Sequence, residues 1–87
     1  MIRTIPHRDF KKDLKRLNKK EIQILEERVR LFVLDPMNPV LNNHSLRGTY
    51  TGYRSINITG DLRLVYEVIG EGIVMFVAID SHSKLYG

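Results

Sequence analysis

Apolar residues recur every three or four positions in the N-terminal third of the chain. Residues 3–5 are predicted to form a short strand that Pro6 ends. Beyond it, lysines and arginines occupy one side of a helical pattern, and the opposite side carries three apolar residues, Phe10, Leu14 and Leu17. This spacing predicts a first amphipathic helix.

A second helical pattern follows at once. Asn18 and Glu21 have the spacing of a capping box, in which each side chain bonds the backbone N–H of the other residue. Asp35-Pro36 stops the pattern after Leu34. The apolar stripe between these signals consists of Ile22, Leu25, Val29, Phe32 and Val33.

The period changes to two in the C-terminal half. Residues 36–48 are predicted to be a loop, and the β-branched and aromatic residues of 53–58, 62–69 and 73–79 predict three strands. The short spacers between these strands favour consecutive antiparallel hairpins. The sequence therefore predicts a single α+β domain over residues 1–87 with the order β-α-α-β-β-β. Its small, twisted, mainly antiparallel sheet is packed on one face by the two N-terminal helices.

Composition narrows the chemistry. The 87 residues contain no cysteine, which excludes disulfides, thiolate zinc sites and cysteine nucleophiles. The apolar runs are far shorter than the roughly 20 residues that cross a bilayer. We therefore expect a cytoplasmic protein without membrane contact.

Charge is concentrated near the N-terminus. The chain has a net charge of +4, and residues 3–20 hold eight basic side chains against two acidic ones. A basic surface attracts polyanions, so this segment is a candidate RNA-binding face. The four residues expected to carry that contact are Lys11, Lys12, Lys15 and Lys19.

Two of the three histidines lie in the C-terminal half among residues suited to RNA cleavage. His44 occurs in Asn-His-Ser-Leu-Arg-Gly and His82 in Asp-Ser-His-Ser-Lys-Leu-Tyr, with Asp61 and Arg63 between them. A free histidine side chain titrates near pH ~6.5, so a pair can supply one general base and one general acid at neutral pH. This constellation predicts a nuclease that uses no metal and no cofactor.

Cleavage of RNA by its own 2'-hydroxyl needs a base, an acid and a cation at the phosphate. His82 is the preferred general acid, with His44 or Asp61 as the base, although which histidine takes which role stays open. Arg63 would stabilise the phosphorane, because a guanidinium matches phosphate oxygens in pairs. The side chains expected to bind the phosphates or stack on a base are Arg47, Arg54, Lys84 and Tyr86.

The order of these motifs resembles the RelE superfamily of toxins from bacterial toxin–antitoxin operons, and the YafQ branch in particular. The resemblance rests on residues 44–48, 52–54, 61–66 and 81–87, about half of the chain. It implies a ribosome-dependent endoribonuclease that cuts mRNA in the A site and contacts ribosomal RNA. It further implies a cognate antitoxin that inhibits the enzyme, and operator DNA binding only through that antitoxin.

Two positions depart from the branch. Asn57 stands where some YafQ-like toxins have another histidine, and an amide cannot exchange a proton at neutral pH. Arg63 replaces an apolar residue and is more similar to the wider RelE group, in which an arginine assists at the scissile phosphate. The departure at Asn57 increases the weight placed on His44 and His82.

Other interpretations of the same residues remain. A metal site is disfavoured because no local histidine pairing occurs and because basic residues surround the candidates. A ParE-like toxin directed at gyrase, or an inactive homologue that only binds its antitoxin, would share the fold. Asp61 can serve as a turn residue, and Arg54 and Arg63 can simply point into water.

Overall fold

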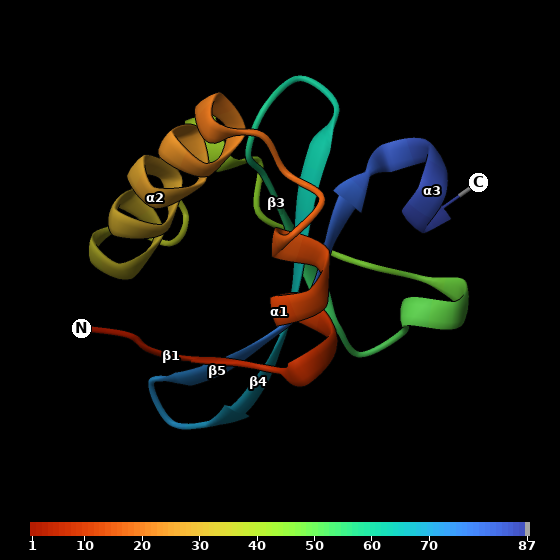
Figure 1. The fold of residues 1–87 in the computed structure, drawn as a ribbon. Coiled ribbons are helices and arrows are strands. Elements are labelled where there is room, and N and C mark those ends of the chain that lie inside the picture. Colours follow the sequence, from red (N-terminus) through yellow and green to blue (C-terminus); the bar gives the residue numbers. More distant parts are fainter. Residues whose placement is uncertain (87) are drawn as a thin grey trace.

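The computed structural model describes residues 1–86 and contains one five-stranded mixed sheet (Figure 1). In Figure 1, α2 lies on one side of this sheet, and α3 lies on the other side together with the short η2 turn. The elements in chain order are β1 (Arg3–Pro6), α1 (Arg8–Leu14), α2 (Lys19–Leu34), η1 (Pro39–Leu41), β2 (His44–Ser45), η2 (Gly48–Tyr50), β3 (Arg54–Asn57), β4 (Leu62–Gly70), β5 (Ile73–Ser81) and α3 (His82–Tyr86).

Local capping fixes where both N-terminal helices begin. The imidazole Nδ1 of His7 accepts a hydrogen bond from the backbone N–H of Asp9, which starts α1. Asn18 and Glu21 form the predicted capping box at the start of α2, with bonds of 2.8 and 2.9 Å. Helix α1 ends at Leu14, earlier than the sequence pattern indicates, although Leu17 still packs against the core.

The strands are ordered β1-β5-β4-β3-β2 across the sheet. The two predicted hairpins are confirmed, because β3 pairs with β4 and β4 pairs with β5, both antiparallel. Strand β1 adds to the free edge of β5 in parallel, and β2 adds to β3 antiparallel. The α+β prediction with a mainly antiparallel sheet is therefore confirmed.

The hydrophobic core lies between the sheet and helices α1 and α2. Ile56, Leu64 and Ile79 are cross-strand partners on β3, β4 and β5, and each is at most 1% exposed. Aromatic rings join the layers, since Phe10 packs on Phe76 at 5.3 Å between ring centroids. Side chains alternate along a strand, so the neighbours of these core residues face the opposite side of the sheet. We call that side the open face.

Besides the short 3-10 helices η1 and η2, the structure adds a strand and a helix that the sequence pattern does not predict. Strand β2 lies inside the segment predicted as a loop, and α3 follows β5 directly at the C-terminal end. Helix α3 has five residues, too few for a stable isolated helix, so its formation depends on contacts with the rest of the fold. No helix among residues 1–86 has both the length and the apolar character needed to cross a membrane.

Candidate active site

The open face of the sheet brings together several of the predicted site residues. Cross-strand partners point to the same side of a sheet. His44 on β2 is the partner of Ser55 on β3, and Asn57 on β3 is the partner of Arg63 on β4. Ser55 and Asn57 are two positions apart, so all four side chains lie on the open face.

Helix α3 covers part of this face. The hydroxyl of Tyr86 donates a hydrogen bond of 3.0 Å to Oγ of Ser55, whose side chain is fully buried beneath it. The ring of His82 packs edge-on against the ring of Tyr86, with 4.9 Å between centroids. The contacts Ser55–Tyr86–His82 therefore connect the C-terminal histidine to the strand position opposite His44.

The position of His82 is fixed through its backbone. The His82 N–H donates to the carbonyl oxygen of Asp61, in the turn between β3 and β4, at 2.9 Å. The imidazole itself is exposed and makes no hydrogen bond with residues 1–86. A firmly held backbone with a free ring suits a group that must exchange a proton with a bound substrate.

The tautomer of His44 follows from its partner. Nδ1 lies 2.7 Å from the carbonyl oxygen of Asn42, and a carbonyl oxygen can only accept a hydrogen bond. Nδ1 therefore carries the proton, and Nε2 of the neutral ring is left with a free lone pair. His44 is exposed, so this nitrogen is accessible from solvent.

Arg63 lies beside the β3–β4 turn. Its Nη1 donates to the carbonyl oxygens of Thr59 and Leu62, at 3.1 and 3.3 Å. No bond to Nη2 or Nε occurs within the described part of the chain, which leaves N–H donors for an anion. Next to it, the buried Oδ1 of Asn57 has no hydrogen-bond partner among residues 1–86.

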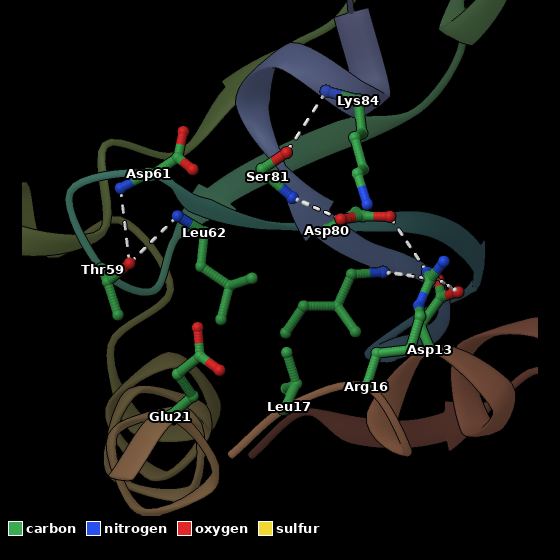
Figure 2. A pocket seen from close by; sticks show the side chains of 11 residues that line it. Asp13, Arg16, Leu17, Glu21, Thr59, Asp61, Leu62, Asp80, Ser81 and Lys84 are labelled. Carbon is green, nitrogen blue, oxygen red and sulfur yellow. Dashed lines mark hydrogen bonds and ion pairs between the residues drawn. The ribbon is translucent and has the colours of Figure 1, made fainter.

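Asp61 lies at the rim of a small polar pocket of about 190 Å³, shown in Figure 2. Its backbone N–H donates to Oγ1 of Thr59, so the side chain of Thr59, and not that of Asp61, bonds the backbone of this turn. Its exposed carboxylate has no bonded partner within residues 1–86 and is free for chemistry. Asp13, Arg16, Glu21, Asp80 and Lys84 also line this pocket.

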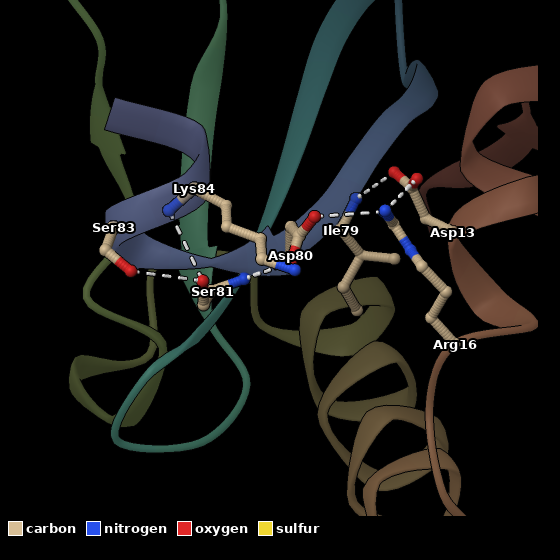
Figure 3. A network of polar contacts seen from close by, with 7 residues as sticks. All are labelled: Asp13, Arg16, Ile79, Asp80, Ser81, Ser83 and Lys84. Atoms are coloured by element: carbon tan, nitrogen blue, oxygen red, sulfur yellow. Dashed lines mark hydrogen bonds and ion pairs between the residues drawn. The ribbon is translucent and has the colours of Figure 1, made fainter. Parts of the chain in front are cut away.

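A polar network holds the junction between β5 and α3 (Figure 3). Strand β1 ends opposite Phe76, and beyond that point Oδ2 of Asp13 accepts the backbone N–H of Ile79 at 3.0 Å. Arg16 bonds both Asp13 and Asp80, the latter at 3.0 Å. Beyond the end of β1, Asp13 of α1 and Arg16 therefore bind the last part of β5 before α3 begins.

Arg54 is not on the open face. It is the partner of Tyr66, which is buried in the core, and its Nε donates to Oδ1 of Asn43 at 2.9 Å. The Tyr66 hydroxyl donates to the same oxygen, so Arg54 takes part in a network that holds the loop before β2. The register of β3 places the Arg54 side chain on the core side of the sheet, and we leave Arg54 out of the substrate site.

The remaining predicted contact residues are exposed. Arg47 precedes η2 and Lys84 lies on α3, next to the site. The four candidate lysines of the basic face are all exposed on α1, after it, and at the start of α2: Lys11, Lys12, Lys15 and Lys19. Among residues 1–86, no group of three or more histidine, aspartate or glutamate side chains is placed to hold a metal ion.

Sequence reasoning missed Ser55, Asn43 and Tyr50. Ser55 is a small polar residue beside an apolar strand position, which signals a polar site on the opposite face. The ring of Tyr50 lies 6.1 Å from the rings of both Tyr53 and Tyr86. The signal for Tyr50 in the sequence was the number of aromatic residues close to the Gly-Tyr-Arg motif of residues 52–54.

A family model described as the bacterial toxin of type II toxin–antitoxin systems, YafQ, matches residues 2–87. No curated protein matches the chain. The crystal structure of YafQ from E. coli strain BL21(DE3) is similar over 100% of both chains, with 22% identity and a TM-score of 0.82. The toxin chain of an E. coli DinJ-YafQ complex also covers both chains fully, with 22% identity and a TM-score of 0.77. A metal-bound toxin from Helicobacter pylori is 26% identical over 99% of this chain and 100% of that chain, with a TM-score of 0.76.

Proposed function

Because the chain belongs to the YafQ family of bacterial type II toxins, we propose that it is an endoribonuclease that cuts mRNA in the ribosomal A site. The observation that carries the proposal is the shared open face, where His44 and Arg63 lie and on which α3 packs through Tyr86. These residue types supply a base, a cation and an acid. The enzyme would act in the cytoplasm, where translation takes place.

His44 is the general base in this mechanism. Nε2 of the neutral ring takes the proton of the ribose 2'-hydroxyl, while Nδ1–H stays bonded to the Asn42 carbonyl and orients the ring. The 2'-oxygen then forms a bond to phosphorus. Asp61, free at the neighbouring turn, is available to stabilise an imidazolium or to act as the base in its place.

Arg63 and His82 complete the reaction. The free N–H groups of Arg63 stabilise the negative charge that develops on the phosphorane oxygens. As the bond from phosphorus to the 5'-oxygen breaks, His82 donates its proton to that oxygen. The products are a 2',3'-cyclic phosphate and a free 5'-hydroxyl. His44 is left protonated and His82 deprotonated, so the two residues have exchanged their acid and base states.

Further residues would contact the RNA, and a second protein would inhibit the enzyme. Tyr86 presents a ring for a base beside the scissile linkage, and Arg47 and Lys84 lie near enough to meet the adjoining phosphates. The exposed lysines near α1 would contact ribosomal RNA. The E. coli relative forms a complex with DinJ, and we infer that a cognate antitoxin likewise binds this chain, with operator DNA reached only through it.

Primer extension on a translated mRNA in a cell-free lysate tests the proposal. Wild-type protein should produce cuts that require translation, and His82→Ala, His44→Ala and Arg63→Ala should each reduce cutting by roughly 10²–10⁴-fold. Arg30→Ala, which removes an exposed arginine of α2, is the matched control and should cut normally. Intact mRNA together with inhibited gyrase supercoiling would instead indicate a ParE-like activity. Intact mRNA and supercoiling, with antitoxin binding retained, would indicate an inactive homologue.

A further inference from the structure

A second hollow lies on the open face, away from His44 and His82. Its volume is about 420 Å³, and it is lined by His7, Asp9, Tyr53, Glu67, Met75 and Val77. Glu67 on β4 is the partner of Met75 on β5 and follows the core residue Tyr66, which places it on the open face. A hollow of this size is within the range of small-ligand sites.

A row of aromatic rings connects this hollow to the proposed active site. The ring of His82 contacts Tyr86, Tyr86 contacts Tyr50, and Tyr50 contacts Tyr53, with centroid separations of 4.9, 6.1 and 6.1 Å. The three tyrosines are half-buried, so each still presents part of its ring to solvent. Aromatic side chains in such a row are typical of surfaces on which unpaired bases stack.

The polar groups of the hollow favour one base. The carboxylate of Glu67 has no hydrogen-bond or ion-pair partner within residues 1–86, whereas Asp9 lies 3.8 Å from the imidazole of His7. A carboxylate only accepts hydrogen bonds and offers two oxygens side by side. Guanine is the RNA base whose Watson–Crick edge presents two adjacent donors, N1–H and the 2-amino group. Adenine, cytosine and uracil each place an acceptor next to their donor, which a carboxylate repels.

We propose that this hollow binds a guanine of the mRNA on the same strand as the cut linkage, stacked on Tyr53 and bonded through its Watson–Crick edge to Glu67. Met75 and Val77 supply the apolar floor. The inference deepens the proposed function, on which it rests. A negatively charged hollow beside a basic site is suited to a base and not to a phosphate. A carboxylate such as that of Glu67 can therefore take part in RNA binding.

A binding measurement tests the site without requiring cleavage. His82→Ala protein is titrated with labelled single-stranded oligoribonucleotides that contain one guanine, adenine or inosine in an otherwise uniform uridine sequence. Guanine should bind roughly ten-fold or more tightly than inosine, which lacks the 2-amino group, and than adenine. Adding Glu67→Gln should remove the preference for guanine over inosine, because an amide offers one acceptor where the carboxylate offers two and pairs with N1–H and O6, which both bases share.

Glu71→Gln is the matched control. Glu71 is an exposed carboxylate in the turn between β4 and β5, outside the hollow, and its loss changes the net charge by the same amount. This variant should keep the guanine preference. Equal binding of all three oligoribonucleotides by the parent, or a guanine preference that persists in Glu67→Gln, would overturn the inference.

A cutting assay separates this inference from the proposed function. In translated mRNAs with each base in turn at every position near one cut site, wild type should favour guanine at one position, and Glu67→Gln should lose that preference. Cutting without any guanine preference would remove the guanine site and leave the nuclease. Guanine binding without cutting would support the guanine site and remove the proposed nuclease activity. A Glu67→Gln variant with unchanged RNA preference but weakened antitoxin binding would assign the hollow to a protein partner.

Discussion

Asp13 should stabilise the fold through one hydrogen bond at the edge of the sheet. Its Oδ2 accepts the N–H of Ile79 just beyond the last residue pair of β1 and β5, and its side chain is only 19% exposed. Asp13→Ala removes this charged acceptor and leaves the backbone N–H with partial access to water at most. Hydrogen bonds to charged groups contribute about 1.5–3 kcal/mol, so a loss of about 2 kcal/mol is expected.

The ion pairs of the same network add little. Arg16 is 56% exposed, and surface pairs of this kind contribute about 0–1 kcal/mol. A loss of about 2 kcal/mol is a large fraction of the stability of a small domain, about 5–15 kcal/mol. In a domain of this size it corresponds to a fall in Tm of about 8–16 °C.

Urea denaturation followed by far-ultraviolet circular dichroism measures the effect, with His82→Ala as the parent to avoid toxicity. Asp13→Asn is the control, because its amide oxygen still accepts from Ile79 while the charge is lost; it should lose about 1 kcal/mol, since a neutral hydrogen bond contributes about 0.5–1.5 kcal/mol. A loss below about 0.5 kcal/mol in Asp13→Ala would refute the reasoning. Equal losses in the two variants would show that charge, and not the hydrogen bond, is what matters.

Four further outcomes are expected. Asn57→His should raise cutting by up to about ten-fold, because it adds an imidazole beside Arg63, whereas Asn57→Ala should not; equal rates in the two would contradict a role for the added ring. Tyr86→Phe should lower the free energy of unfolding by about 1 kcal/mol by breaking the bond to Ser55 while cutting persists, and unchanged stability in urea would argue against that bond. Cutting should survive EDTA once ribosome integrity is controlled, and its loss would point to a metal. Charge reversal on the basic face should weaken ribosome binding and flatten its salt dependence, and an unchanged slope in co-sedimentation would exclude that contact; the residues to reverse are Lys11, Lys12, Lys15 and Lys19.

Features that depend on neighbours in the chain were predictable. The capping box of Asn18 and Glu21 begins α2 where expected, because both bonds form within one helical turn. The hairpins were also predictable, because the alternation of polar and apolar residues and the short spacers between strands are local features of the sequence. Helix α1 was predicted too long because Leu17, which packs against the core, lies in the turn after the helix. A turn and a helix can both bring this residue to the core, so the apolar period does not distinguish them.

Features that depend on strand register were not predictable. Arg54 shares a face with Ile56 because side chains alternate along a strand, and whether that face meets the core or stays open depends on how the strand is paired and packed. The same rule moved Glu67 to the open face and left Tyr66 in the core. No local pattern fixes such a choice when polar and apolar residues occur on both sides of a strand.

The sequence by itself determined the two N-terminal helices and the main strands, the basic N-terminal segment and the residue types available for acid and base chemistry. Only the tertiary structure decided which of them meet. Helix α3 is too short to form alone, and it exists because Asp61 accepts the N–H of His82 and Ser55 accepts the hydroxyl of Tyr86. Those partners lie 21 and 31 positions away along the chain, so packing of the whole sheet was required before His82 had a defined place.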